Sequence, residues 1–103
     1  MRKRVLLIDD CRNVSYASVI VRTYEDGISA LLNMGPWDEL LLDHDLGPWS
    51  YSEHTGRDMT GYDIMCFLES GAAPLPKKIT LVTDNPVGRD RMQQVINKLY
   101  PKE

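Results

Sequence analysis

Three short apolar runs, each followed directly by polar residues that include an aspartate, constrain the fold of this chain most. The runs cover residues 5–8, 40–42 and 79–82. They are continuously apolar rather than alternating, which is typical of parallel strands buried on both faces. Residues 17–22 are rich in β-branched side chains and indicate a further strand. The sequence therefore predicts an α/β fold with a mainly parallel sheet of four strands.

Three helices are predicted from residues that can cap a helix and from the apolar positions that follow them. The helices begin near Thr23, Thr60 and Asn85, and each then places apolar residues on one face. The link between the first two strands is short for a helical crossover, which needs about 10–12 residues, so we expect no full helix there. Strands that otherwise alternate with helices predict a single three-layer domain over residues 1–103. Right-handed crossovers give the spatial strand order 2-1-3-4.

Charge and hydropathy exclude several classes of function. The 103 residues carry a net charge of −3, and the only basic cluster is residues 2–4. Proteins that bind duplex nucleic acid normally carry a larger basic surface. No apolar run in the sequence approaches the roughly 20 residues of a membrane helix, and the run 5–8 is too short for a signal peptide. We therefore expect a cytoplasmic protein with no membrane partner and no duplex nucleic acid partner.

The ends of the predicted strands carry a group of polar residues. In open parallel sheets, ligands bind outside the carboxyl ends of the strands. The residues at three of these ends are Asp9, Asp10, Asp43, His44, Asp45, Thr83, Asp84 and Asn85. Clustered carboxylates repel unless a cation or a proton neutralises them, and oxygen ligands suit Mg²⁺ or a similar hard cation. Structural alternatives stay open for each strand end. Asp9 and Asp10 could form a turn, Asp43 and Asp45 could belong to a loop around a structural His44, Asp84 could be a solvated side chain, and Asn85 could cap a helix.

Two of these segments resemble response-regulator receiver domains, which have a flavodoxin-like fold. The segments are residues 7–10 (Leu-Ile-Asp-Asp) and residues 41–43 (Leu-Leu-Asp). In that family an acidic pair after the first strand binds Mg²⁺, and the aspartate that ends the third strand accepts a phosphoryl group. Thr83 matches the family's hydroxyl position. The chain departs from the family because its first helix is almost absent and because the lysine of the fifth strand has no counterpart.

A narrower family resembles more of the chain. Similarity to the cyclic-phosphate-processing receiver-like domains of bacteria and phages lies in residues 42–47 (Leu-Asp-His-Asp-Leu-Gly), in residues 55–56 or 60–63, and in residues 83–88 (Thr-Asp-Asn-Pro-Val-Gly) with Met92. The resemblance covers nearly the whole chain, and it implies that the protein acts on a cyclic phosphate or a cyclic nucleotide. In that family a histidine usually precedes the threonine of the fourth strand, and here that position is Val82.

The resemblance implies roles for the residues after the first and third strands. Asp9, Asp10 and Asp43 would hold Mg²⁺ or Mn²⁺. Histidine titrates near neutral pH, so His44 would act as a general acid or base. Asp45 would orient His44.

Residues at the end of the fourth strand would bind the ligand. Thr83, Asn85 and Gly88 would contact its phosphate, helped by backbone N–H groups at the start of the last helix. The first hypothesis is therefore a receiver-like domain that binds a divalent metal and a phosphate-bearing small molecule or nucleotide. This hypothesis includes hydrolysis of a cyclic phosphate as its activity.

Two other functions stay open. The chain could be a non-catalytic interaction protein, such as a phage-encoded one that binds a host protein through the receiver-like surface. Its contact would be the aromatic segment 49–54, within the stretch 44–59 that has no clean period and reads as a loop. Trp and Tyr side chains often anchor protein interfaces. In a third hypothesis, Asp43 is a phosphoacceptor.

Overall fold

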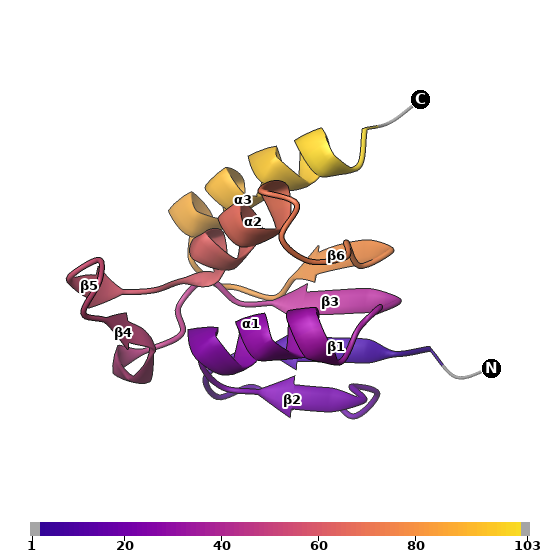
Figure 1. Cartoon of the computed structure of the whole chain (residues 1–103), viewed down its shortest axis with the longest axis horizontal. Helices are drawn as coiled ribbons and strands as arrows, with labels where there is room; N and C mark the ends of the chain where they lie inside the picture. The colour runs from indigo at the N-terminus through magenta and orange to yellow at the C-terminus, as the bar shows by residue number, and fades with distance from the viewer. Residues whose placement is uncertain (1–2, 102–103) are drawn as a thin grey trace.

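A four-stranded parallel sheet forms the centre of the computed structural model, which describes residues 3–101 (Figure 1). Its order is β2-β1-β3-β6, and the strands are β1 (Val5–Ile8), β2 (Val19–Val21), β3 (Glu39–Leu42) and β6 (Lys78–Leu81). In this register Ile8 pairs with Leu42, and Leu42 pairs with Leu81. The predicted fold class, strand order and parallel pairing are confirmed. The carboxyl ends of β1, β3 and β6 therefore lie at the same edge of the sheet.

The three predicted helices are present, and their caps are those that the sequence indicated. They are α1 (Tyr24–Asn33), α2 (Gly61–Glu69) and α3 (Pro86–Leu99). The side chain of Thr23 accepts a hydrogen bond from the backbone N–H of Asp26 at 3.1 Å. The carboxylate of Asp63 accepts one from the backbone N–H of Thr60 at 2.8 Å. Among residues 3–101, no helix has the length and apolar character needed to span a bilayer.

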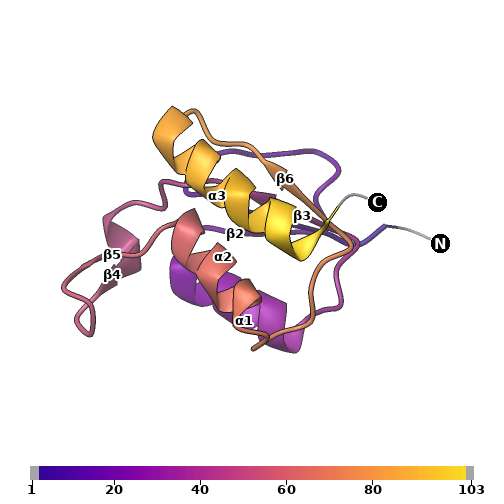
Figure 2. The same cartoon turned by 90° about the horizontal axis from the view of Figure 1, so that it is seen from above.

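All three helices pack on one face of the sheet. Their apolar residues share a core with Leu6, Ile8, Leu40 and Leu42, which alternate along β1 and β3 with residues that face the other way. On the opposite face a smaller cluster forms around Val5, Leu7 and Leu41, with Val14, Ala17 and Val82 packed against it. Figure 2 shows the loop after β1 on this side, away from α1 and α2. That loop contains no helix, as expected, so a loop rather than a helix forms the layer on this face.

The stretch between β3 and α2 is more ordered than the loop that the sequence predicted. It contains a short 3₁₀ helix, η1 (Pro48–Ser50), and an antiparallel hairpin of β4 (Tyr51–Ser52) and β5 (Arg57–Asp58). The hairpin projects beyond the edge of the sheet at the left of Figure 1. Its base is fixed to α1, because the hydroxyl of Ser50 accepts a hydrogen bond from the backbone N–H of Tyr24 at 2.9 Å.

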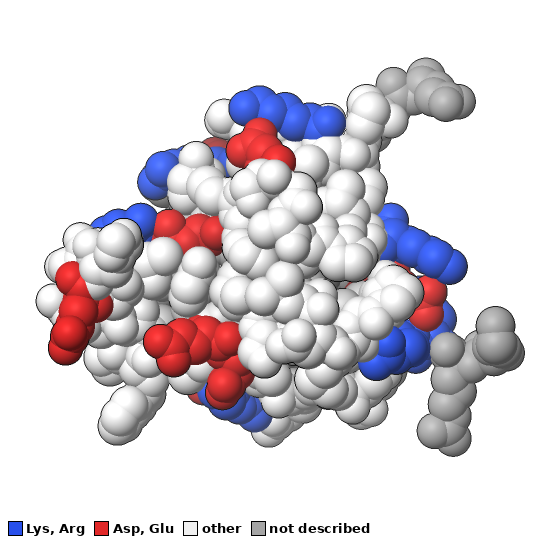
Figure 3. All heavy atoms as spheres, viewed as in Figure 1, with Lys and Arg blue, Asp and Glu red and all other residues white. Residues whose placement is uncertain are grey.

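Charged side chains of both signs are distributed over the surface. On the face shown in Figure 3, basic side chains are separated by acidic and uncharged ones, so the described residues form no continuous basic surface on that face.

Candidate functional site

The carboxyl edge of the sheet brings three strand ends together. The backbone N–H of Asp43 donates to the carbonyl of Ile8 at 3.0 Å, and that of Val82 donates to the carbonyl of Leu42 at 3.1 Å. The hydrogen-bond ladder therefore continues one residue past the strands, setting Asp9 beside Asp43 and Asp43 beside Val82, with Thr83 one position further on. Asp9, Asp43 and Thr83 are 0%, 7% and 1% exposed. Three polar side chains are thus buried at the carboxyl edge of the sheet.

Asp9 is held in its ionised form by the loop that follows it. One oxygen, Oδ1, accepts the backbone N–H groups of Cys11 at 3.0 Å and Arg12 at 2.8 Å. The other, Oδ2, accepts a hydrogen bond from Nη1 of Arg12 at 2.9 Å. Burial by itself raises the pKa of Asp9, but these hydrogen bonds and the positive charge of Arg12 outweigh it and lower the pKa.

Folding shifts the pKa of Asp43 in the opposite direction from that of Asp9. Its pKa is raised, first by burial and then by the negative charge of Asp9. Hydrogen bonds from the Thr83 hydroxyl and from the backbone N–H of His44, the latter at 2.8 Å, offset part of that rise. Two carboxylates at neighbouring strand ends therefore repel each other, and a positive charge nearby relieves the repulsion.

Arg12 supplies such a charge, and the sequence reasoning missed it. Its Nη1 atom lies 4.0 Å from Oδ2 of Asp43, besides its bond to Asp9. Its Nη2 atom donates to Oδ2 of Asp84 at 2.9 Å. One guanidinium thus contacts carboxylates after β1, β3 and β6. The signal in the sequence was a basic residue three positions after Asp9, in the loop next to the acidic pair.

His44 is positioned by contacts from three sides. Strand β3 ends at Leu42, and after the turn Nδ1 of His44 lies 2.9 Å from Oδ1 of Asp45. The Nδ2 atom of Asn85 lies 3.4 Å from the same nitrogen. Gly88 packs against the imidazole, since a Cβ at this position would lie 2.4 Å from ring atoms. The side chain of His44 is 14% exposed, so these contacts leave little of it open to solvent.

The other two predicted ligand residues connect the parts of the site. The hydroxyl of Thr83 accepts a hydrogen bond from the backbone N–H of Asn85 at 3.1 Å. The side-chain oxygen of Asn85 accepts one from the backbone N–H of Gly88 at 3.0 Å and so caps α3, which was the structural alternative for this residue. Thr83 bonds to Asp43, Asn85 contacts His44, and His44 contacts Asp45. Seven of the eight predicted site residues therefore belong to one neighbourhood of contacting groups.

Asp10 is the remaining predicted residue, and it is exposed at the rim. Ligand atoms of Asp9, Asp10 and Cys11 lie within 4.8 Å of one another. The pKa of Cys11 is raised, first by the negative charge of Asp10 and then by burial, so without a metal its thiol loses its proton less readily than a free cysteine. The carboxylates of Asp9, Asp10 and Asp43 are the kind of oxygen ligands that a hard divalent cation prefers. Asp43 is not part of the group that Asp9 and Asp10 form, so the structure does not bring the ligand atoms of all three predicted metal ligands within 4.8 Å of one another. Arg12 instead contacts Asp9 and Asp43.

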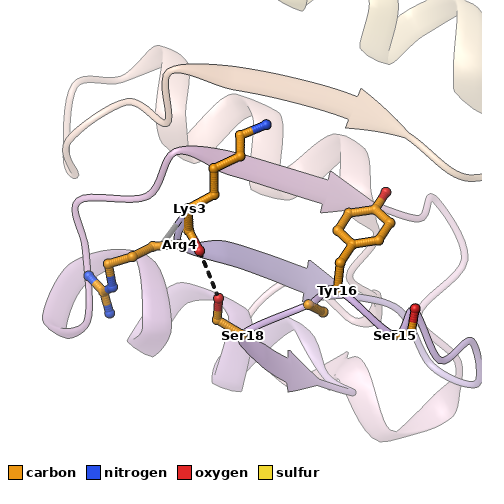
Figure 4. Close-up of a pocket in the computed structure, with 6 residues that line it drawn as sticks. Lys3, Arg4, Ser15, Tyr16 and Ser18 are labelled. Carbon is orange, nitrogen blue, oxygen red and sulfur yellow. Dashed lines mark hydrogen bonds between the residues drawn. The ribbon is translucent and has the colours of Figure 1, made fainter. Parts of the chain in front are cut away.

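A separate recess lies on the face of the sheet opposite the helices. It has a volume of about 780 Å³ and is lined by Lys3, Arg4, Ser15, Tyr16, Ala17 and Ser18. Figure 4 shows Lys3 and Tyr16 extending over the strands on this side. The recess gathers no carboxylate, histidine or cysteine among its lining residues, in contrast to the carboxyl edge.

The fold and this edge define a class of protein. A parallel sheet with buried aspartates after β1 and β3 and a buried threonine after β6 is the arrangement of a receiver-type domain. Residues 4–98 match the family model described as the cyclic-phosphate processing receiver domain, and the chain belongs to that family. No curated protein and no solved structure gave a significant match.

Val82 occupies the position where the resemblance led us to expect a second histidine. Its side chain packs with the apolar cluster around Leu7 and Leu41, on the face that the loop covers. An apolar residue suits that surrounding, so the replacement is consistent with a packing role.

Proposed function

We propose that this domain hydrolyses a cyclic phosphate, with His44 as the residue that transfers a proton. Its family implies a cyclic-phosphate processing role. The observation that carries the proposal is the 2.9 Å contact between Nδ1 of His44 and Oδ1 of Asp45. An ionised carboxylate only accepts hydrogen bonds, so this contact favours a proton on Nδ1 and leaves Nε2 to exchange a proton with a ligand.

The proposed reaction adds one water molecule to the ligand. The water oxygen forms a bond to phosphorus, and one ester P–O bond of the ring breaks. The water gives up a proton and the leaving oxygen gains one, so the product is a phosphate monoester with a free hydroxyl group. His44 would take or give one of these protons, while Asp45 would keep its ring oriented.

Asp9, Asp10 and Asp43 are the proposed ligands of Mg²⁺ or Mn²⁺. When bound, the metal would supply positive charge that stabilises the phosphate oxygens. Burial and then the negative charge of Asp9 raise the pKa of Asp43, and a cation between the two carboxylates would lower the free energy of their ionised forms. Asp10 adds an exposed carboxylate at the rim.

Thr83, Asn85 and Gly88 are the proposed residues on the phosphate side. The cap at α3 uses the oxygen of Asn85 and leaves its Nδ2 group as a donor. These residues lie at the N-terminal end of a helix of 14 residues, where the helix dipole favours an anion.

The proposal is tested with a panel of cyclic nucleotides and of RNA ends that carry a 2′,3′-cyclic phosphate, each with and without millimolar Mg²⁺. We expect phosphate monoester to form from at least one substrate, and Mg²⁺ to accelerate its formation. A pure, folded protein that is inactive on the whole panel under both conditions would contradict it.

The metal is tested by thermal melts, because a ligand that binds only the folded state raises its stability. We expect millimolar Mg²⁺ to raise the melting temperature of the wild type and to raise that of Asp43→Asn less. The metal assignment is wrong if the wild type shows no shift, or if the variant shows the same shift.

The exposed aromatic residues of the hairpin segment favour a second candidate function, the binding of a protein partner. Trp49 is 87% exposed and Tyr51 is 55% exposed. Replacing such an exposed aromatic side chain by alanine changes the stability of the monomer little. In a complex, the same side chain often contributes much of the binding free energy. Loss of a defined partner in Trp49→Ala, with an unchanged melting temperature and no hydrolysis by the wild type, would favour this function over the first.

A further inference from the structure

We propose that Arg12 is the resident cation of the carboxyl edge, and that a divalent metal ion competes with its guanidinium for Asp9 and Asp43. The inference rests on the metal site of the proposed function and concerns how occupancy of that site is controlled. It assigns Arg12 a role as a positioning residue that acts through the two carboxylates.

The contacts of Arg12 lie at the oxygens that a metal would share. Its Nη1 atom is 2.9 Å from Oδ2 of Asp9 and 4.0 Å from Oδ2 of Asp43. These two carboxylates lie at neighbouring strand ends, and both are buried. A cation that coordinates both Oδ2 atoms has to take the place of the guanidinium group.

The side chain of Arg12 reaches the surface, whereas the Asp9 carboxylate that it contacts does not. Its side chain is 35% exposed, whereas that of Asp9 is fully buried. The backbone N–H groups of Cys11 and Arg12 hold Oδ1 of Asp9 independently of the guanidinium. A displaced Arg12 side chain would therefore reach solvent, while the carboxylate would keep its orientation for the metal.

The surroundings of the guanidinium favour this role over direct binding of a phosphate. Its two terminal nitrogens already face carboxylates of Asp9, Asp43 and Asp84. An anion at this point would meet three negative charges within a short distance, and like charges repel. The positive charge of Arg12 is therefore paired with these three carboxylates and neutralises part of their negative charge.

Arg22 provides a matched control. It lies beside Arg12, but its Nη1 atom donates to backbone carbonyls, that of Asp9 at 3.2 Å and that of Arg12 at 2.5 Å. Its Nη2 atom donates to the side-chain oxygen of Asn13 at 2.5 Å. Removing Arg22 deletes the same charge from the same region without freeing a carboxylate.

The test measures the affinity for Mn²⁺ by the loss of the free-ion EPR signal, in the wild type, Arg12→Gln, Arg12→Lys and Arg22→Gln. We expect Arg12→Gln to bind Mn²⁺ about tenfold more tightly than the wild type, because the competing charge-assisted hydrogen bonds are gone. Arg12→Lys should gain less, and Arg22→Gln should gain about twofold at most, because only long-range charge is removed. Without metal, Arg12→Gln should melt at a lower temperature than the wild type.

The outcomes separate this inference from the proposed function. Equal Mn²⁺ affinities of the wild type and Arg12→Gln, or an equal gain in Arg22→Gln, would overturn the competition and leave the metal site intact. The absence of Mn²⁺ binding from every variant would overturn both the competition and the metal ligands, while the hydrolysis panel still tests His44. If Arg12→Gln does not fold, Arg12→Lys decides, since a gain no larger than that of Arg22→Gln would also overturn the inference.

Discussion

Asp9 and Asp43 are neighbouring buried carboxylates, yet folding affects their ionisation in opposite directions. The pKa of Asp9 is lowered because hydrogen bonds from the loop outweigh its burial. The pKa of Asp43 is raised because burial and the charge of Asp9 outweigh its own hydrogen bonds. Ionised Asp9 therefore stabilises the folded state, and ionised Asp43 destabilises it.

We expect this difference to show in the pH dependence of stability without metal. At pH 7, Asp43→Asn should raise the melting temperature and Asp9→Asn should lower it. The pKa of Asp43 is raised in the folded state, so ionised Asp43 destabilises that state fully only above the raised pKa. The higher melting temperature of Asp43→Asn should therefore disappear as pH falls toward the ordinary pKa near 4. The stabilisation from Asp9, whose pKa is lowered, is complete above its ordinary value and is lost as pH falls further.

Melts in EDTA from pH 3 to pH 8 measure both effects. A lower melting temperature for Asp43→Asn than for the wild type at pH 7 would contradict the direction given for Asp43.

His44 is the residue on which the proposed hydrolysis depends most. General acid–base catalysis contributes about 10²–10⁴-fold, so His44→Ala should lower turnover by that factor on any cyclic phosphate that the wild type cleaves. Asp45→Asn should lower turnover less, because it changes only the group that orients the imidazole and keeps the imidazole itself.

His54, the other histidine of the chain, is exposed in the hairpin segment and serves as the control. His54→Ala should keep full turnover. Full activity in a folded His44→Ala protein would remove His44 from the mechanism, and an unfolded one would indicate a structural role instead.

The starts of α2 and α3 meet the chain where it leaves β3, and two glycines allow this approach. A Cβ on Gly61 would lie 2.0 Å from the carbonyl oxygen of Asp43. The backbone N–H of Gly61 donates to the carbonyl of His44 at 2.8 Å. A Cβ on Gly88 would instead meet the imidazole of His44. Helix position and site geometry are therefore fixed by the same contacts.

The two glycines should respond differently to alanine. Gly61→Ala places a methyl group on backbone that cannot rotate away, so we expect a loss of about 1–3 kcal/mol in the free energy of unfolding. Gly88→Ala meets a side chain that can turn, and it gains up to about 1 kcal/mol of helix propensity, so its stability should change less.

Gly88→Ala should nevertheless lower turnover, because the imidazole has to move. Urea unfolding and the hydrolysis assay on both variants measure the two effects. An equal loss of stability in both would show that the His44 ring is held as rigidly as the backbone.

At the scale of the whole molecule, helices cover one face of the sheet and a loop covers the other. Three helices pack over Leu40, and a loop packs over Leu41, although both side chains are fully buried. Leu40→Ala should cost about 2–5 kcal/mol in the free energy of unfolding, as is usual for a cavity in a packed core.

Leu41→Ala should cost less than Leu40→Ala, because a loop can collapse into the space more readily than packed helices can. Urea unfolding of the two variants is the measurement. An equal or larger loss in Leu41→Ala would show that the loop over β1 and β3 is as rigid as the helical layer.

The sequence by itself determined the elements and the edge at which the polar residues gather. Continuous apolar runs define buried parallel strands, and residues such as Thr23 and Asn85 cap helices through contacts only a few positions away. Because parallel strands end at one edge, Asp9, Asp43 and Thr83 could be placed together before any coordinates. These features depend on local periodicity and on neighbours along the chain, which a sequence displays directly.

Only the tertiary structure decided which side chains meet at that edge and which face of the sheet the helices cover. Arg12 contacts Asp84 across 72 positions, and Asn85 contacts His44 across 41. Such pairs depend on how far each loop folds back and on how closely a helix start approaches a strand end, as Gly61 and Gly88 allow here. No period in the sequence records that geometry, because it arises from packing between elements rather than from any one of them.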